Sequence, residues 1–463
     1  MKKYYIYIAA GVLLLIILLL IILGLRGKDK DDSSKQQGSY PTENFTLTYW
    51  GTQEEASVFK PIIENYQENH PNATIKYIQK KISSYESELI NAMAEGNGPD
   101  IFEIKNDWLP KHKNKITPAP LDIFNKNYIE ENFYSVVSSD FVENDKVYAV
   151  PHCIETFALI ENIGLKQKRV DEIAERTDDA DYISKLSNDP KTWNDFVYQA
   201  KHLTLKKGVY IDTPTIAMGT SNNTNISEDI LYLLMLQNKT KMVSDDLKTP
   251  EFNLPITKSD GKEYYAGTAA LSFDASFADP KKETYSWSTK MPNALNWFIN
   301  GKLIYMFAYP DTIEYILQKN PSLKISVIKT PQVAGTDQEM YYANYWGATV
   351  NKDSKNSYAA WDFIQFINST NAGAELYMSA TNRNAANKAL NFRASNSNVQ
   401  NYAVFNEQLT NSVSWYKGIY PEKVDATFKK MITNVNNGQT SQRAIDAAAK
   451  TIRSYLQINQ ATQ

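Results

Sequence analysis

Apolar and polar positions along the first part of the chain follow strand and helix periods in turn. Residues Phe45–Trp50 alternate β-branched and aromatic side chains and end at Gly51, which predicts a strand that runs into a loop. Apolar residues then recur at helical spacing over 59–66, and residues 74–78 predict a second strand. A strand, a helix and a strand in this order predict a parallel unit, which leads on to a third predicted strand at 100–104.

The rest of the chain repeats this alternation, with glycine and proline residues between the elements. Pro190–Phe196 has the pattern of a capped helix start, residues 357–367 carry one apolar helical face, and 440–456 predict an alanine-rich helix. Strands are predicted at 147–150, 156–160, 302–307, 324–327 and 343–350. The pattern therefore predicts the α/β class, and the chain length predicts two lobes at about 150 residues for a typical domain.

The N-terminus carries a long apolar segment. Lys2 and Lys3 precede an uncharged run, Tyr4–Leu25, and about 20 apolar residues are enough for a helix to span a membrane. We therefore expect an uncleaved single-pass membrane anchor at 1–25 and a flexible tether at 26–41, with the soluble part outside the cytoplasm. A cleavable signal peptide, which has a shorter apolar region and a small-residue cleavage site, stays open as the alternative.

Composition narrows the class of partner. A formal net charge of −3, with the charges spread along the chain, argues against a nucleic-acid surface. Cys153 is the one cysteine, so the chain forms no internal disulfide and has no cysteine beside the apolar segment for a lipid. The chain contains 30 Tyr and 8 Trp, which favours exposed aromatic rings at a binding surface.

Several segments, in this order, resemble one family. The most specific is Pro-Lys-Thr-Trp-Asn-Asp-Phe at 190–196. The others are Leu47–Gly51, His70–Ile75, Ala94–Ile101, Val147–Pro151, Leu159–Asn162, Phe298–Met306, Tyr345–Val350 and Ala360–Ile364. Together they resemble the extracellular (family 1) solute-binding proteins of ABC importers, in the branch of the maltose- and oligosaccharide-binding proteins. The chain departs from many members of that family in having no lipid-attachment cysteine.

The resemblance implies a two-lobed, periplasmic-binding-protein-like α/β fold with crossing hinge strands. We expect lobe I at 42–154 plus 347–375 and lobe II at 155–346 plus 376–463. A sugar or short oligosaccharide would bind between the lobes, which close by a hinge motion and present the ligand to a membrane permease. Open α/β sheets bind ligands at the carboxyl ends of their strands, which agrees with this placement.

Candidate ligand-binding residues follow from both arguments. Trp50 comes at a predicted strand end, and Asn106, Asp107 and Trp108 follow the next strand along the chain. The resemblance implies sugar contacts for Asp107, Glu155, Tyr309, Asp311, Tyr345, Trp346 and Arg383. Aromatic faces stack on sugar rings, and carboxylates accept hydrogen bonds from hydroxyl groups. A role in core packing for each tryptophan, and in loop hydrogen bonds for each carboxylate, stays open as the alternative.

An enzyme is not indicated. The chain contains no Gly-x-Ser-x-Gly nucleophile elbow, no His-Glu-x-x-His and no phosphate-binding Gly-Lys-Ser/Thr. The four histidines are isolated, so we expect neither a metal site nor a cofactor. Two other functions stay open: a binder of a peptide or other small polar solute, and a surface protein that binds, degrades or adheres to glycans without transport.

Overall fold

The computed structural model describes residues 39–258, 260–381, 383–390 and 399–458. Contacts divide the chain into two compact units, Met1–Tyr40 and Pro41–Gln463, and the second unit holds the fold described below. The expected anchor at 1–25 lies outside the described residues, as does most of the expected tether at 26–41. Within the described ranges, no helix combines the length and the apolar character that a membrane span requires.

Five strands form the first sheet, in the order β2-β1-β3-β15-β4. Strand β1 is parallel to β2 and β3, which confirms the expected parallel unit, and β15 pairs with β3 in the antiparallel direction. Trp346 of β15 lies opposite Lys105 of β3, so the amino end of β15 lies beside the carboxyl end of β3. The strands are β1 (Phe45–Gly51), β2 (Ala73–Gln79), β3 (Ile101–Lys105), β4 (Ile116–Thr117) and β15 (Trp346–Asn351).

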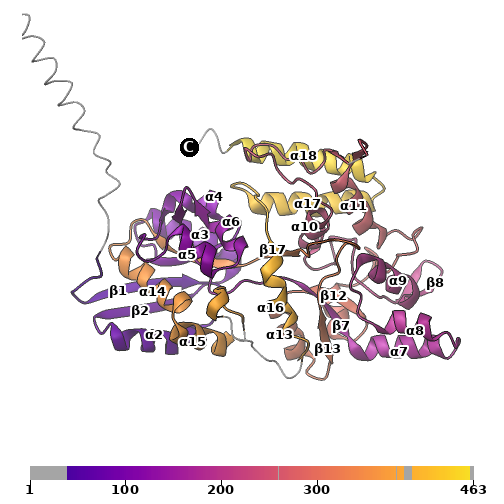
Figure 1. Cartoon of the computed structure of the whole chain (residues 1–463), viewed down its shortest axis with the longest axis horizontal. Helices are drawn as coiled ribbons and strands as arrows, with labels where there is room; N and C mark the ends of the chain where they lie inside the picture. Colours follow the sequence, from indigo (N-terminus) through magenta and orange to yellow (C-terminus); the bar gives the residue numbers. More distant parts are fainter. Residues whose placement is uncertain (1–38, 259, 382, 391–398, 459–463) are drawn as a thin grey trace, which may run out of the picture. The chain divides into compact units, whose positions relative to one another are not determined.

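Helices cover both faces of this sheet. Helix α2 (Ala56–Asn69) and helix α15 (Asn371–Thr381) lie on one face, and α3 (Ile82–Ala94) lies on the opposite face (Figure 1). Tyr49 of β1 is fully buried on the α2 face, where its ring centroid lies 5.1 Å from that of Phe59. The other elements of this lobe are α4 (Leu109–His112), η2 (Lys113–Lys115), α5 (Lys126–Asn132), α6 (Ser135–Phe141), α14 (Ser357–Ser369) and η3 (Lys388–Leu390).

The segment after α14 stays with the first sheet. Helix α15 packs against α2, and the backbone beyond it forms bridges from Ala385 to Cys153 and from Asn387 to Phe133. These contacts favour a lobe boundary after Leu390 rather than after residue 375. The expected division at 42–154 plus 347–375 and 155–346 plus 376–463 remains a prediction.

The second sheet has the order β12-β7-β13-β16. All five residues of β7 are buried. Leu159 packs into one apolar core, whereas Ala158 and Ile160 pack into another on the opposite face. A strand buried on both faces is apolar without alternation, as Ala158–Ile160 is, and polar residues follow only at its end, Glu161 and Asn162. The strands are β7 (Ala158–Asn162), β12 (Tyr305–Ala308), β13 (Ile325–Ile328) and β16 (Val399–Gln400).

Helices of this lobe pack on both faces of the second sheet. The expected helix start is confirmed at α9, where the Thr192 hydroxyl accepts from the Asp195 amide and the Asp195 carboxylate accepts from the Thr192 amide. The elements are α7 (Ile163–Ala174), α8 (Ala180–Ser187), α9 (Trp193–Leu203), α10 (Ser227–Gln237), α11 (Ala266–Ser276), α12 (Ala294–Ile299), α13 (Pro310–Lys319), α16 (Val404–Gln408), η4 (Leu409–Asn411), α17 (Pro421–Asn436) and α18 (Ser441–Ile458).

Two segments cross between the lobes side by side. The first crossing segment is 148–157, which leads into β7, and the return crossing is 343–345, which leads into β15. Val150 pairs with Ala348, and Thr156 pairs with Ala343, both as antiparallel bridges. The expected strand at 147–150 is wrong beyond Val147. That residue ends a short hairpin, and the chain then crosses toward the second sheet with an isolated bridge at Val150. Short strand pairs complete the fold: β5 (Val142–Glu143) with β6 (Lys146–Val147), β8 (Leu205–Lys207) with β9 (Tyr210–Thr213), β10 (Ile256–Thr257) with β11 (Glu263–Tyr264), and β14 (Tyr341–Tyr342) with β17 (Ser412–Val413).

Candidate functional site

A small cavity lies where the first sheet ends and the crossing segments begin. Its free volume is about 20 Å³, which is room for about one water molecule. The loop after β1, the first crossing segment, the start of β15 and the segment after α15 all contribute to its wall. Its polar and aromatic lining includes Gln53, Glu54, Glu155, Tyr345, Trp346 and Arg383.

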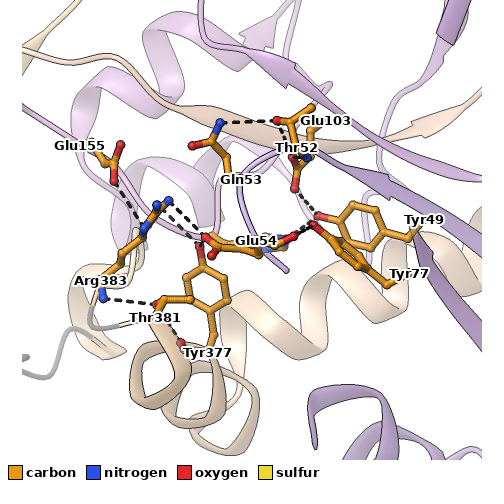
Figure 2. A network of polar contacts seen from close by, with 12 residues as sticks. Tyr49, Thr52, Gln53, Glu54, Tyr77, Glu103, Glu155, Tyr377, Thr381 and Arg383 are labelled. Atoms are coloured by element: carbon orange, nitrogen blue, oxygen red, sulfur yellow. Dashed lines mark hydrogen bonds and ion pairs between the residues drawn. The ribbon is translucent and has the colours of Figure 1, made fainter. Parts of the chain in front are cut away.

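Arg383 lies between two carboxylates at this cavity (Figure 2). Its Nη1 atom lies 3.1 Å from Oε1 of Glu54, and its Nε atom lies 3.5 Å from Oε1 of Glu155. Tyr377 donates a hydrogen bond of 2.8 Å to Oε1 of Glu54 from the other side. Within the described ranges, neither Arg383 Nη1 nor Glu155 Oε1 forms an aligned hydrogen bond. Both atoms therefore keep capacity for a ligand.

The Glu155 carboxyl is held near its titration point. Burial raises the pKa of Glu155 to about 7, although Arg383 acts to lower it, and the charges of Asp311 and Glu54 raise it further. A carboxyl group with a raised pKa is protonated or ionised according to what lies beside it. It can accept a hydrogen bond from a hydroxyl group in one state and donate one in the other.

A second buried acid, Glu103, also lines the cavity. Glu103 Oε2 accepts a hydrogen bond of 2.9 Å from the Thr52 amide. Tyr49 Oη lies 3.0 Å from Glu103 Oε1 and 2.7 Å from His152 Nε2. Burial raises the pKa of Glu103 to about 7 and lowers that of His152 to about 4. The Tyr49 hydroxyl donates to Glu103 Oε1 and meets the His152 ring on its other side, so it links these two buried groups.

Next to the cavity, Lys417 forms a buried ion-pair cluster. Its Nζ atom lies 3.0 Å from Asp107 Oδ2 and 2.8 Å from Asp425 Oδ1, and it lies 4.8 Å from the ring centroid of Tyr232. Burial opposes the charges, yet Lys417 and Lys105 lower the pKa of Asp107 below its ordinary value. Asp107 follows β3 and Asp425 lies in α17, so this cluster ties the two lobes together.

Asp140 accepts hydrogen bonds from residues on the same border. Tyr345 Oη donates to its Oδ2 at 2.7 Å, Asn106 Nδ2 donates to the same atom at 3.1 Å, and the Ser414 hydroxyl donates to Oδ1. Burial raises the pKa of Asp140 to about 7. The Tyr345 hydroxyl and the Asn106 amide are therefore committed to Asp140, which leaves the ring of Tyr345 as its contribution to the cavity.

The chain matches the model of a known protein family. The model of the bacterial extracellular solute-binding proteins matches residues 50–374, well over half of the 463-residue chain. The chain belongs to this family. This match confirms the family that the sequence predicted. The cavity described above is therefore a cavity of a solute-binding protein.

Individual relatives agree with this assignment. A maltotriose-binding protein of Pyrococcus abyssi (strain GE5 / Orsay) is 28% identical over 124 residues, which are 26% of this solute-binding protein and 27% of the relative's length. The sugar-binding protein MalE of Xanthomonas citri superposes with a TM-score of 0.70 at 16% identity, covering 90% of this chain and 98% of that one. A cyclo/maltodextrin-binding protein complexed with maltotetraose superposes with a TM-score of 0.69 at 17% identity, covering 90% of this chain and 99% of that one. These structures confirm the two-lobed α/β fold.

Four of the predicted site residues meet at the cavity of this solute-binding protein. They are Glu155, Tyr345, Trp346 and Arg383. Glu155 comes from the first crossing segment, Tyr345 and Trp346 from the return crossing, and Arg383 from the segment after α15. Their role in ligand binding remains a prediction.

Three other predicted residues lie beside the cavity rather than in its wall. Asp107 pairs with Lys417, and Asn106 donates to Asp140. Trp108 is 7% exposed, and its ring centroid lies 5.2 Å from that of Trp346 in an edge-to-face contact. Trp108 therefore holds the ring of Trp346 in place.

The last three predicted residues are separate from the cavity wall. Trp50 lies within β1 on the face opposite Tyr49, with the Lys80 Nζ atom 3.7 Å from its ring centroid. Tyr309 is buried and donates a hydrogen bond of 2.9 Å to Asp229 Oδ2. Asp311 is exposed in the first turn of α13, from which its charge acts on Glu155.

Sequence reasoning missed Glu54, Glu103, Tyr377 and Lys417. The sequence did contain a signal for Glu103, which is a charged residue inside a predicted apolar strand. Burial of a charge costs free energy, so such a residue indicates a polar site. Glu54 follows the predicted strand end at Gly51 closely and could have been included with that loop. Nothing in the local sequence around Lys417 distinguishes it from a surface lysine.

Proposed function

We propose that this protein is the extracytoplasmic receptor subunit of an ABC transporter and binds a sugar or short oligosaccharide between its lobes. The observation that carries the proposal is the cavity where the first sheet ends and the crossing segments begin, which Trp346, Arg383 and Glu155 line together. The ligands of three similar proteins support it. Two of these proteins bind maltotriose and maltotetraose, respectively. The third, a solute-binding protein of Thermotoga lettingae with a TM-score of 0.66 and 17% identity, is bound with alpha-D-tagatose.

The chemistry of the cavity suits a saccharide. The apolar face of a pyranose ring packs on an aromatic ring, and the ring hydroxyl groups pair with a guanidinium donor and a carboxylate acceptor. A free volume of about 20 Å³ is too small for a sugar. Binding therefore requires the lobes to separate about the crossing segments and then to close around the ligand.

The cellular setting completes the proposal. Residues 1–25 anchor the chain in the cell membrane as a single-pass helix, residues 26–41 form the tether, and the lobes lie outside the cytoplasm. The closed, loaded form delivers the solute to the membrane permease without a covalent change, so the protein is a receptor and not an enzyme. No cofactor takes part in this scheme.

Titration calorimetry on the purified chain tests the proposal. The saccharide panel is maltose, maltotriose, maltotetraose and tagatose, and the contrasting panel is amino acids, short peptides and divalent metal ions. We expect a saccharide to bind and the contrasting panel to give no heat. Binding of a peptide or amino acid alone would replace the sugar by another solute, and turnover of a glycan by the purified chain would favour the surface glycan-degrading protein.

A further inference from the structure

The cavity carries an excess of acidic groups. Among the described residues in its wall, Arg383 is the one with a permanent positive charge, whereas Glu54, Glu103 and Glu155 are acids. Glu103 is engaged by Thr52 and Tyr49. Glu54 and Glu155 face Arg383 from two sides, as Figure 2 shows.

Helix α13 adds two further acids from the second lobe. The charges of Asp311 and Glu314 act on Glu155, and the same two residues act on each other. Arg383 is the basic group that opposes Glu314. Arg383 thus faces the two carboxylates of Glu54 and Glu155 directly and also opposes the charge of Glu314.

The one cation that an anionic ligand would meet among the described residues of this wall is Arg383, whose Nη1 atom has capacity for a ligand but lies 3.1 Å from Glu54 Oε1. A ligand carboxylate or phosphate would therefore compete with Glu54 and Glu155, whose side chains are 8% and 12% exposed, for the same guanidinium group. A buried carboxylate that loses its partner is costly. A ligand ammonium group, by contrast, would meet an acceptor that already lacks an aligned donor, Glu155 Oε1.

We propose that the cleft selects its sugar by charge: it prefers a saccharide that carries a primary amino group, accepts the neutral counterpart more weakly, and rejects the counterpart with a carboxylate. Glu155 is the residue that contacts the ammonium group, and Glu54 together with Arg383 holds it in position. This inference rests on the proposed function, because it specifies the saccharide class of the same cleft.

The mechanism of selection is electrostatic. A unit charge about 4 Å from a carboxylate at a partly buried site is worth enough to change affinity by about tenfold or more. The amino group adds this attraction to the stacking and hydroxyl contacts that the neutral sugar also makes. The carboxylate sugar makes the same contacts but adds a repulsion of similar size.

Calorimetry with saccharides that differ in one group tests the inference on the full chain in detergent. Chitobiose carries amino groups, cellobiose and N,N′-diacetylchitobiose are its neutral counterparts, and cellobiuronate carries a carboxylate; maltose and maltotriose are included as further neutral sugars. We expect chitobiose to bind about tenfold more tightly than the neutral disaccharides. We expect cellobiuronate to give no detectable heat.

Two variants locate the effect. Glu155→Gln keeps the shape and loses the negative charge, so it should reduce the preference for chitobiose by about tenfold while neutral sugars still bind. Asp274→Asn is the matched control, since Asp274 is a buried acid in α11 whose pKa is likewise raised to about 7 by burial but which does not line the cavity. This control should keep the preference unchanged.

The outcomes separate this inference from the proposed function. If maltose or cellobiose binds and chitobiose binds no better, or if cellobiuronate binds equally well, charge selection is wrong and the sugar receptor stands. If chitobiose is preferred but Glu155→Gln keeps the full preference, the assignment to Glu155 is wrong. If no saccharide binds, both proposals fail.

Discussion

Two buried cations, Arg383 and Lys417, lie at the border between the lobes, and each faces acidic side chains. Lys417 is 3% exposed and sits between Asp107 and Asp425, at 3.0 and 2.8 Å. Arg383 is 11% exposed and sits between Glu54 and Glu155, at 3.1 and 3.5 Å.

The two clusters differ in the direction in which the pKa of their carboxyl groups is shifted. Lys417 holds the pKa of Asp107 below its ordinary value despite burial, whereas the pKa of Glu155 rises to about 7 despite Arg383. The Lys417 cluster is therefore a structural tie with its ionic form strongly favoured. Among the described residues, a carboxylate oxygen lacks a hydrogen-bond partner in each cluster, Asp107 Oδ1 in one and Glu155 Oε1 in the other, but only Glu155 and Arg383 line the cavity, where a ligand can reach them.

The largest expected effect follows from removing the tie. Lys417→Met leaves the buried Asp107 and the partly buried Asp425 without their cation, so we expect the free energy of unfolding to fall by about 3–5 kcal/mol. Urea denaturation followed by circular dichroism measures it. Lys429→Met is the control, because Lys429 pairs with Glu228 at 2.9 Å but is 48% exposed, and it should cost less than about 1 kcal/mol. Equal losses for the two variants would show that Lys417 is not a special tie.

The pH dependence of stability should have opposite signs in the two clusters. The folded-state pKa of Glu155 is raised from 4.5 to about 7, so its contribution to stability is full below its unfolded pKa and is lost as pH rises through about 7. Between about pH 5 and about pH 8, Glu155→Gln should therefore gain roughly 2–3 kcal/mol relative to the unsubstituted protein.

Asp107 provides the contrast. Its pKa is lowered from 3.8, so its stabilising contribution is present above that value and is lost as pH falls through the folded-state pKa. Asp107→Asn should thus show its full cost at neutral pH and a shrinking cost in acid. Urea titrations of Glu155→Gln between about pH 5 and about pH 8, and of Asp107→Asn from neutral pH down through about pH 4 and below, measure the two slopes. Slopes of the same sign would contradict the distinction between the clusters.

The affinity for ligand should depend on the Arg383 cluster. Arg383→Gln removes a charged donor from the cavity, and we expect the affinity for the neutral saccharide that binds best to weaken by roughly 1–3 kcal/mol. Calorimetry measures this loss. An unchanged affinity, in a variant whose circular dichroism spectrum is unchanged, would place the ligand elsewhere.

The smallest expected effect separates two tryptophans that the sequence treats alike. Trp346→Leu should weaken saccharide affinity by roughly 0.5–1.5 kcal/mol, because it removes the ring on which a sugar packs. Trp50→Leu is the matched control, since Trp50 lies in β1 under Lys80 and does not line the cavity. Calorimetry on both variants decides between them; equal losses would mean that neither ring marks the ligand.

The fold was predictable because its signals are local. The strand at 45–50, the capped helix at 190–196 and the helix at 357–367 each carry their own period or cap, and the structure confirms them as β1, α9 and α14. The segment at 147–150 failed because its apolar character serves a crossing segment that forms isolated bridges, and such a segment has the same pattern as a strand.

The site was predictable only in part. Glu155 and Trp346 lie on the crossing segments, whose positions the family pattern fixes. Which acid borders the cavity and which forms the tie depends on partners far along the chain: Asp107 meets Lys417, and Glu155 meets Arg383. No local pattern contains that information, because it arises only when distant segments of the chain fold together.

Hydrogen exchange measured by mass spectrometry, on the full chain with and without its best saccharide, tests the central claim most directly. The account predicts ligand-dependent protection in peptides that cover Gln53–Glu54, Cys153–Glu155 and Tyr345–Ala348, the segments that line the cavity. Protection should be absent around β8 and β9 at the far hairpin of lobe II. Protection confined to segments away from the cavity would contradict the account.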